Sequence, residues 1–199
     1  MADTPMDEVR SRVYGREAAL AERAVVLLDK LSRSTIHPYV LYSTTANLTR
    51  NDETDMTVRD YRHDQDGPFV ITRCRLYTTT SGPGASAAVA PFSNVALRVT
   101  DMDGRNTLTK DPVLFPVLAS IRDNTWVFDR PYVLERRSAL LVQVTEQDIN
   151  ATTDVYVGFL GETVIGDMTA REVSEAIALG VYPMAGRQTT VWDHALLFG

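Results

Sequence analysis

The sequence has very little cysteine and histidine. Cys74 is the one cysteine, which excludes an intrachain disulfide framework and a zinc site built from several thiolates. The three histidines, His37, His63 and His194, share no ligand spacing such as His-x-His or His-Glu-x-x-His. The sequence therefore predicts no bound metal, and we expect Cys74 to be a small, buried or half-buried side chain in a strand.

Basic residues are also scarce, and most of them are arginine. The chain has a formal net charge of −6, and Lys30 and Lys110 are its only lysines. Proteins that bind nucleic acid usually show clustered basic residues, so this charge argues against such a partner. Arginine forks suit fixed pairing with carboxylates, which fits a protein that makes interfaces.

Long apolar runs are missing as well. No stretch reaches the roughly 18 apolar residues of a membrane-spanning helix. Residues 1–8 are acidic and polar, unlike a signal peptide. We therefore expect no membrane partner and synthesis in a cytoplasm.

Motifs for catalysis are not found in the sequence. It contains no Gly-x-Ser-x-Gly and no glycine-rich phosphate loop. Metal-dependent cupin enzymes use His-x-His on a jelly-roll barrel, so its absence weakens that interpretation. The acidic segment 50–67 includes His63, but its few apolar residues indicate a solvated loop or strand edge, not a shielded cleft. The sequence predicts neither an enzyme nor a cofactor.

Residues 7–33 are rich in strong helix formers and predict one long helix. Leu20, Ala24, Leu27 and Leu31 follow a 4-3-4 spacing, which places them in one row along the helix. Two interpretations stay open. The row packs on the helix's own domain, or it pairs with a neighbouring subunit.

From residue 38 the pattern changes to about eight short β segments separated by turn signals. Phe69–Tyr77 is the longest, and Val95, Leu97 and Val99 alternate with more polar residues. The other segments are 39–42, 112–118, 126–128, 131–134, 140–145 and 154–160. No helix is expected between them, so the pattern predicts a mainly β fold, an antiparallel β-sandwich of jelly-roll type.

The last part of the chain combines a short helix with an apolar tail. Thr169 and Glu172 form a capping-box pattern, and Gly180 is a stop signal after about Leu179. The terminal residues 189–199 are unusually apolar for a chain end. This tail packs on its own domain or on a partner, through Val191, Trp192, Leu196, Leu197 and Phe198. The expected domains are a helical arm at 1–37, the sandwich at 38–166, and the C-terminal helix and tail at 167–199.

The order of β segments over residues 68–160 resembles small β-sandwich virion proteins of tailed bacteriophages, encoded among head and neck components. The strings that carry this resemblance are Pro68-Phe-Val-Ile-Thr72, Val95-Ala-Leu-Arg-Val-Thr-Asp101, Asp111-Pro-Val-Leu-Phe115, Arg130-Pro-Tyr-Val-Leu134, Ser138-Ala-Leu-Leu-Val-Gln-Val-Thr145 and Val155-Tyr-Val-Gly-Phe-Leu160. The resemblance implies a non-enzymatic protein that decorates the capsid or forms part of the neck or collar. It implies no catalytic residues.

Three functional hypotheses follow. The first is a structural virion protein, a homo-oligomer (a trimer is one form) that contacts major capsid or neck and connector proteins through its terminal arms. The second is a carbohydrate- or receptor-binding module of spike or fibre type, with Tyr77, Trp126 and Tyr132 as aromatic candidates. A cupin-like enzyme is a third and weaker alternative.

Overall fold

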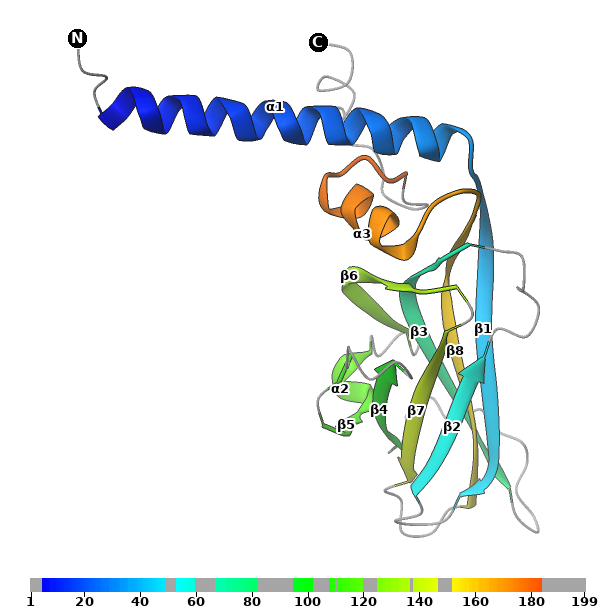
Figure 1. Cartoon of the computed structure of the whole chain (residues 1–199). Helices are drawn as coiled ribbons and strands as arrows, with labels where there is room; N and C mark the ends of the chain where they lie inside the picture. Colours follow the sequence, from blue (N-terminus) through cyan, green and yellow to red (C-terminus); the bar gives the residue numbers. More distant parts are fainter. Residues whose placement is uncertain are drawn as a thin grey trace.

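The computed structural model describes residues 5–48, 53–59, 67–81, 95–101, 108–109, 111–119, 125–136, 138–146 and 152–183. Within this part of the chain, eight strands form two sheets, and a long N-terminal helix crosses one end of them (Figure 1). The elements are α1 Pro5–Ser32, β1 Thr35–Leu48, β2 Glu53–Arg59, β3 Phe69–Ser81, β4 Val95–Asp101, β5 Val113–Leu114, α2 Phe115–Leu118, β6 Thr125–Leu134, β7 Ala139–Glu146, β8 Thr152–Ile165 and α3 Ala170–Ala178.

The strand pairing defines a jelly roll. One sheet has the order β1-β8-β3-β6, and the other has the order β2-β7-β4-β5. The antiparallel pairs are β1–β8, β2–β7, β3–β6 and β4–β5. The first strand thus pairs with the last, the second with the seventh, and so on toward the middle of the chain. A long antiparallel ribbon folded across itself gives this pattern, and the β3–β8 and β4–β7 pairs complete the two sheets. The predicted mainly β, antiparallel sandwich is confirmed.

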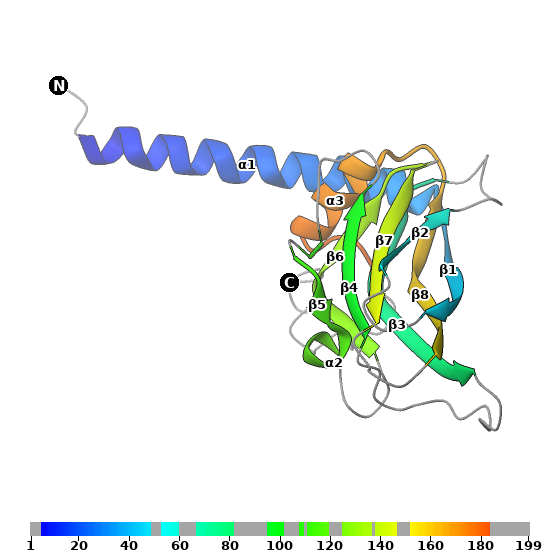
Figure 2. The same ribbon diagram turned by 90° about the horizontal axis from the view of Figure 1, so that it is seen from below.

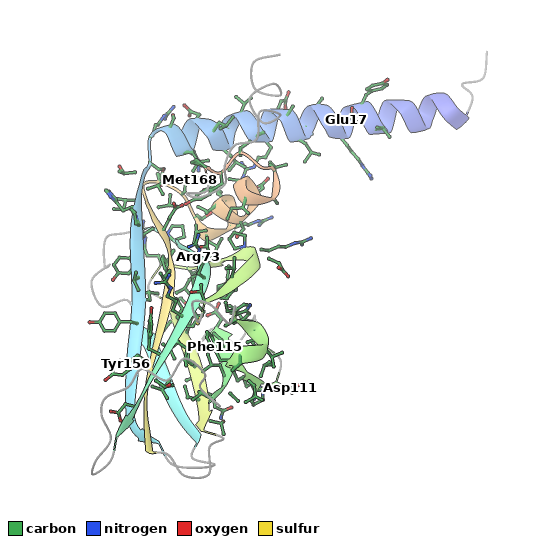
Figure 3. All side chains as sticks on the ribbon, turned by 180° about the vertical axis from the view of Figure 1, so that it is seen from behind. Glu17, Arg73, Asp111, Phe115, Tyr156 and Met168 are labelled. Carbon is green, nitrogen blue, oxygen red and sulfur yellow. The ribbon has the colours of Figure 1, made fainter. Side chains whose placement is uncertain are left out.

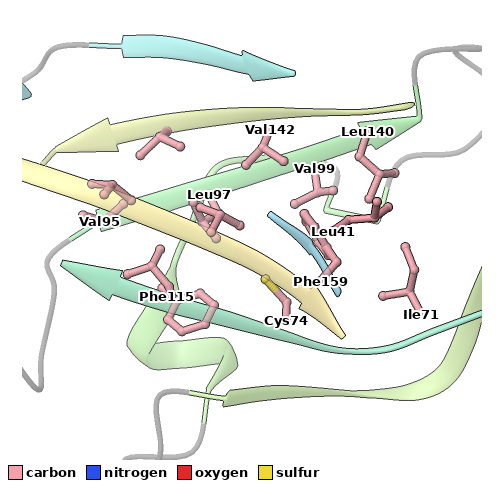
Figure 4. Close-up of a cluster of buried hydrophobic side chains, with 14 of the residues drawn as sticks. Leu41, Ile71, Cys74, Val95, Leu97, Val99, Phe115, Leu140, Val142 and Phe159 are labelled. Atoms are coloured by element: carbon pink, nitrogen blue, oxygen red, sulfur yellow. The ribbon is translucent and has the colours of Figure 1, made fainter. Parts of the chain in front are cut away.

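The main core lies between the two sheets. Along β8, Val155, Val157 and Phe159 are buried, because alternate residues of a strand point to the same face. Figure 4 shows side chains from both sheets meeting in this layer, with Cys74 among them. Cys74 is fully buried, as predicted, and burial raises the pKa of its thiol. A protonated, enclosed thiol is a packing group and not a reactive one.

A second, smaller core lies at the end of the sandwich beneath α1. Its buried side chains come from α1, α3, the segments on either side of α3, and the ends of β3 and β8, namely Leu27, Leu31, Val70, Val164, Met168, Val173, Ala176 and Tyr182. Figure 1 shows α3 between α1 and the sheets. This cluster attaches the N-terminal helix to the body.

The start and end of α3 follow the sequence signals. Thr169 Oγ1 accepts from the Glu172 backbone N–H at 3.3 Å, and Glu172 Oε2 accepts from the Thr169 N–H at 3.1 Å. Gly180 follows the helix with φ of 73°, in the left-handed region that glycine adopts without strain. The predicted capping box and glycine stop are confirmed.

Several predicted boundaries were wrong. The segment 112–118 was predicted as β with no helix between the strands, but only Val113–Leu114 is a strand and Phe115–Leu118 is a short helix. Two prolines explain much of the remaining error. The sequence indicated short strands at 39–42, 126–128 and 131–134, but β1 runs through Pro38 and β6 runs through Pro131. Both strands lie at the edges of their sheet, where a residue without a backbone N–H is tolerated. The acidic segment 50–67 was interpreted as a loop or edge, and β2 within it is an edge strand that pairs with β7.

Candidate interaction surfaces

The base of α1 is clamped to α3 by ion pairs that Arg23 and Lys30 make with Glu172 and Glu175. Arg23 Nε and Nη2 donate to Glu175 Oε1 and Oε2, each at 2.9 Å, in a bidentate arrangement. Lys30 Nζ donates to Glu172 Oε1 at 2.7 Å. These contacts fix the direction in which α1 leaves the body.

The clamp changes the pKa of the groups that form it. The hydrogen bond from Lys30, supported by the Thr169 backbone N–H, lowers the pKa of the Glu172 carboxyl. The hydrogen bond from Arg23 lowers the pKa of Glu175, and this carboxylate raises the pKa of Arg23. Because water reaches these side chains, we expect the clamp to orient the helix more than it stabilises the fold.

The predicted row on α1 is divided between two environments. Leu27 is 0% exposed and Leu31 is buried, both in the chain's own core, and Ala24 is half-buried. Leu20, seven residues before Leu27, is 54% exposed. The row therefore packs on its own domain at the base of the helix. Its N-terminal end lies where α1 extends past the sheets (Figure 2).

A second apolar row lies on another face of α1, and sequence reasoning missed it. Its members repeat at 4-3-4-3 spacing and are all exposed, with Tyr14 at 68% and Val25 at 65%. We call this the outer row: Tyr14, Ala18, Ala21, Val25 and Leu28. The same spacing in the sequence could have shown it, but the two alanines make it less conspicuous than a row of leucines. Rows of this spacing are typical of helices that pack on another helix.

Acidic side chains border the outer row. Glu17 lies on one side of it, and Glu22 and Asp29 lie on the other, by their positions on the helix. Figure 3 shows Glu17 on the part of α1 that extends beyond the body. Asp29 is already paired, since Arg33 Nη2 donates to both of its carboxylate oxygens. The two glutamates leave this face of the helix acidic.

The three aromatic candidates for ligand binding fall into two groups. Trp126 and Tyr132 pack against the core, and the Tyr132 hydroxyl donates to the buried carboxylate of Asp101 at 2.6 Å. Tyr77 instead lies on the outer face of the sheet β1-β8-β3-β6 and is exposed. Tyr77 is therefore the most exposed of the three, whereas Trp126 and Tyr132 are half-buried and line a second hollow of about 310 Å³.

Two further tyrosines join Tyr77 on this face. Tyr77 of β3 lies opposite Tyr156 of β8, and Tyr42 of β1 lies opposite Gly158 of β8. Figure 3 labels Tyr156 on the outer side of the sheet. Because Gly158 has no side chain, a hollow of about 250 Å³ opens above it, which we call the tyrosine hollow. Its walls are Val40, Tyr42, Arg75, Tyr77, Tyr156, Val157, Gly158 and Leu160.

Other predicted features lie partly outside the described residues. The tail candidates all belong to residues 184–199, whose structure is not described here: Val191, Trp192, Leu196, Leu197 and Phe198. Within the described ranges, no group of three or more His, Cys, Asp or Glu side chains could hold a metal ion. The described helices include none that is long and apolar enough to cross a membrane.

Comparison with known proteins adds one weak similarity. No family model matches the chain, and no curated protein does. One solved structure with some likeness is the decameric capsid protein of the virus BFDV, at 10% sequence identity. The match covers 65% of this chain and 98% of that chain, with a TM-score of 0.25. A TM-score this low carries no argument, so the description as a jelly roll rests on the strand pairing.

Proposed function

We propose that this chain is a non-enzymatic structural protein of a virion, and specifically of a tailed bacteriophage. In this role it decorates the capsid or forms part of the neck or collar through repeated protein–protein contacts. The observation that carries the proposal is α1, a helix of 28 residues that is clamped at its base and bears an exposed outer row. The jelly roll alone does not decide the function, because capsid proteins, lectins and cupins share it.

The outer row suits a contact that gains strength by repetition. Complete burial of one Val or Leu side chain stabilises a complex by about 1.5–3 kcal/mol. Association costs at least about 4 kcal/mol in lost freedom of motion. One short row that includes two alanines would therefore bind weakly, whereas several copies on one particle would bind firmly through their high effective concentration.

The acidic border of the outer row favours a particular kind of partner surface. In a parallel pair of α1 helices, Glu17 of one copy would lie near Glu22 of the other, and like charges would repel. A groove with basic residues along its sides would attract both carboxylates. We therefore expect the arm to dock on the body of a neighbouring subunit or on a capsid, neck or connector protein.

The test compares two neighbouring valines on α1. Val25 belongs to the outer row, whereas Val26 is also exposed but lies off that row. We expect Val25→Ser to lower co-sedimentation with particles produced from the same genome at least about tenfold, and Val26→Ser to leave it unchanged. Light scattering over a range of concentrations reports self-association for the same variants.

The two outcomes separate the alternatives. Normal particle binding and normal solution mass for Val25→Ser would rule out the outer row as the contact surface. A full chain that stays monomeric and does not co-sediment with particles would contradict the structural function itself.

A further inference from the structure

We propose that the tyrosine hollow binds one acidic sugar residue, such as the carboxylate-bearing unit of a glycan. This site lies on the outer face of β1-β8-β3-β6 and involves no residue of α1. It is a ligand-binding activity in addition to the structural function, and it gives the carbohydrate-binding hypothesis a location that the sequence alone did not provide.

The shape of the hollow comes from one missing side chain. Gly158 pairs with Tyr42 on one side and with Arg75 on the other, so it forms the floor between two side chains that stand up from the sheet. Its volume of about 250 Å³ is below the roughly 300–1,000 Å³ of pockets that hold drug-sized ligands. A single six-membered ring is therefore a suitable occupant.

The walls suit the two kinds of surface that a sugar ring presents. Tyr42 is 73% exposed, and Tyr77 and Tyr156 are exposed beside it. A tyrosine ring packs against the C–H face of a sugar, and its hydroxyl donates to or accepts from the sugar hydroxyls. The three tyrosines come from three adjacent strands, so the sheet holds them in fixed relative positions.

The charge of the site selects an acid. Among the described residues that line the hollow, Arg75 is the charged one, in a chain whose formal net charge is −6. Its Nε donates to Thr125 Oγ1 of β6 at 3.0 Å, which orients the guanidinium. A guanidinium recognises a carboxylate through paired hydrogen bonds. A neutral sugar would leave this group without a matching partner.

A protein partner fits this surface less well. Stable protein interfaces bury about 800 Å² on each side. Here the apolar surface is limited to a small concave site. Charged residues come next along the strands: Arg73 two residues before Arg75, and Asp154 two residues before Tyr156. The observations therefore favour a small ring-shaped ligand.

The experiment uses the full chain and two matched probes. Glucuronic acid carries a carboxylate where glucose carries a hydroxymethyl group, so the comparison isolates the effect of the charge. Titration followed by NMR chemical shifts is expected to show glucuronic acid binding at least about tenfold more tightly than glucose. Added salt should weaken the binding of the acid, because Arg75 is partly exposed.

Two variants test the hollow itself. Arg75→Gln should bring the affinity for glucuronic acid down to that for glucose. Gly158→Ala should abolish binding of both sugars without lowering the melting temperature, because the added Cβ would meet Val40 Cγ1 at 3.9 Å and the Leu41 carbonyl oxygen at 4.0 Å, ordinary contacts. An alanine also suits a strand better than a glycine does.

Three results would overturn the proposal: no shift with either sugar, equal affinity for both, or normal binding by Gly158→Ala. A change of solution mass in Gly158→Ala, with no sugar binding by the unsubstituted chain, would instead identify this face as a contact between copies. The Val25→Ser variant is expected to bind the sugar normally, so failure of the sugar site and failure of the structural function remain distinguishable.

Discussion

The two halves of α1 are one continuous helix with different surroundings. At the base, Leu27 and Leu31 are buried, and Arg23 and Lys30 are paired with α3. From Val13 to Glu22, every residue is exposed. Strong helix formers occur throughout, so local propensity does not distinguish the halves. The difference comes from α3, which lies beneath one half and not beneath the other (Figures 1 and 2).

This contrast distinguishes the residues that stabilise the protein from those that remain available for contacts with a partner. Residues of the anchored half should affect the free energy of unfolding, because their burial is lost when the chain unfolds. Residues of the projecting half should affect association instead.

The largest effect is expected from the same substitution at two positions of one row. Leu27→Ala should lower the free energy of unfolding by about 2–5 kcal/mol, because it leaves a cavity in the core beneath α1. Leu20→Ala should change it by less than about 0.5 kcal/mol, because Leu20 is exposed. Urea unfolding of both variants, at concentrations where light scattering shows a monomer, provides the measurement. Equal losses would mean that the projecting half is covered in solution.

The contrast also explains which parts of the structure could be predicted from the sequence. The capping box at Thr169 and Glu172 and the burial of Cys74 depend on short segments, and both were predicted. Whether Leu27 is buried and Leu20 exposed depends on where α3 lies. That helix is far along the chain, since the paired Arg23 and Glu175 are 152 residues apart. No pattern within residues 7–33 contains that information.

The tyrosine hollow shows the same limit for the sheets. Tyr77 was singled out, but Tyr42 and Tyr156 were not. They meet because β8 is hydrogen-bonded between β1 and β3, and because the register places Gly158 opposite Tyr42 and Arg75. A strand's alternation can be recognised from its own residues, whereas its neighbours and register depend on the whole topology.

An intermediate effect is expected from pH, because the clamp depends on ionised carboxylates. Lys30 lowers the pKa of Glu172 in the folded state, so this group stabilises the fold above its unfolded pKa of about 4.3. That contribution should disappear as the pH falls through the lower, folded pKa. The melting temperatures of the unsubstituted chain and of Glu172→Gln should therefore differ at pH 6, and the difference should shrink as the pH is lowered below about 4.3.

Two features of this design isolate the ion pair. Glutamine can still accept from the Thr169 N–H, so Glu172→Gln retains the capping box. Lys30→Gln removes the same ion pair from the other partner and should also converge with the unsubstituted chain at low pH. If the Lys30→Gln curve ran parallel to that of the unsubstituted chain, the helix cap and not the clamp would be the source of the pH dependence.

The smallest effect on global stability is expected at Gly15, in the projecting half. A Cβ at this position would meet no atom within 4 Å, and alanine is favoured over glycine by about 1 kcal/mol inside a helix. Gly15→Ala should therefore raise the far-UV helical signal and slow hydrogen exchange over residues 13–22. The melting temperature should stay the same, because a helix without tertiary contacts frays independently of the body to which it is attached. A rise of several degrees in melting temperature would show that the projecting half unfolds together with the sandwich, and the contrast between the two halves of α1 would then be wrong.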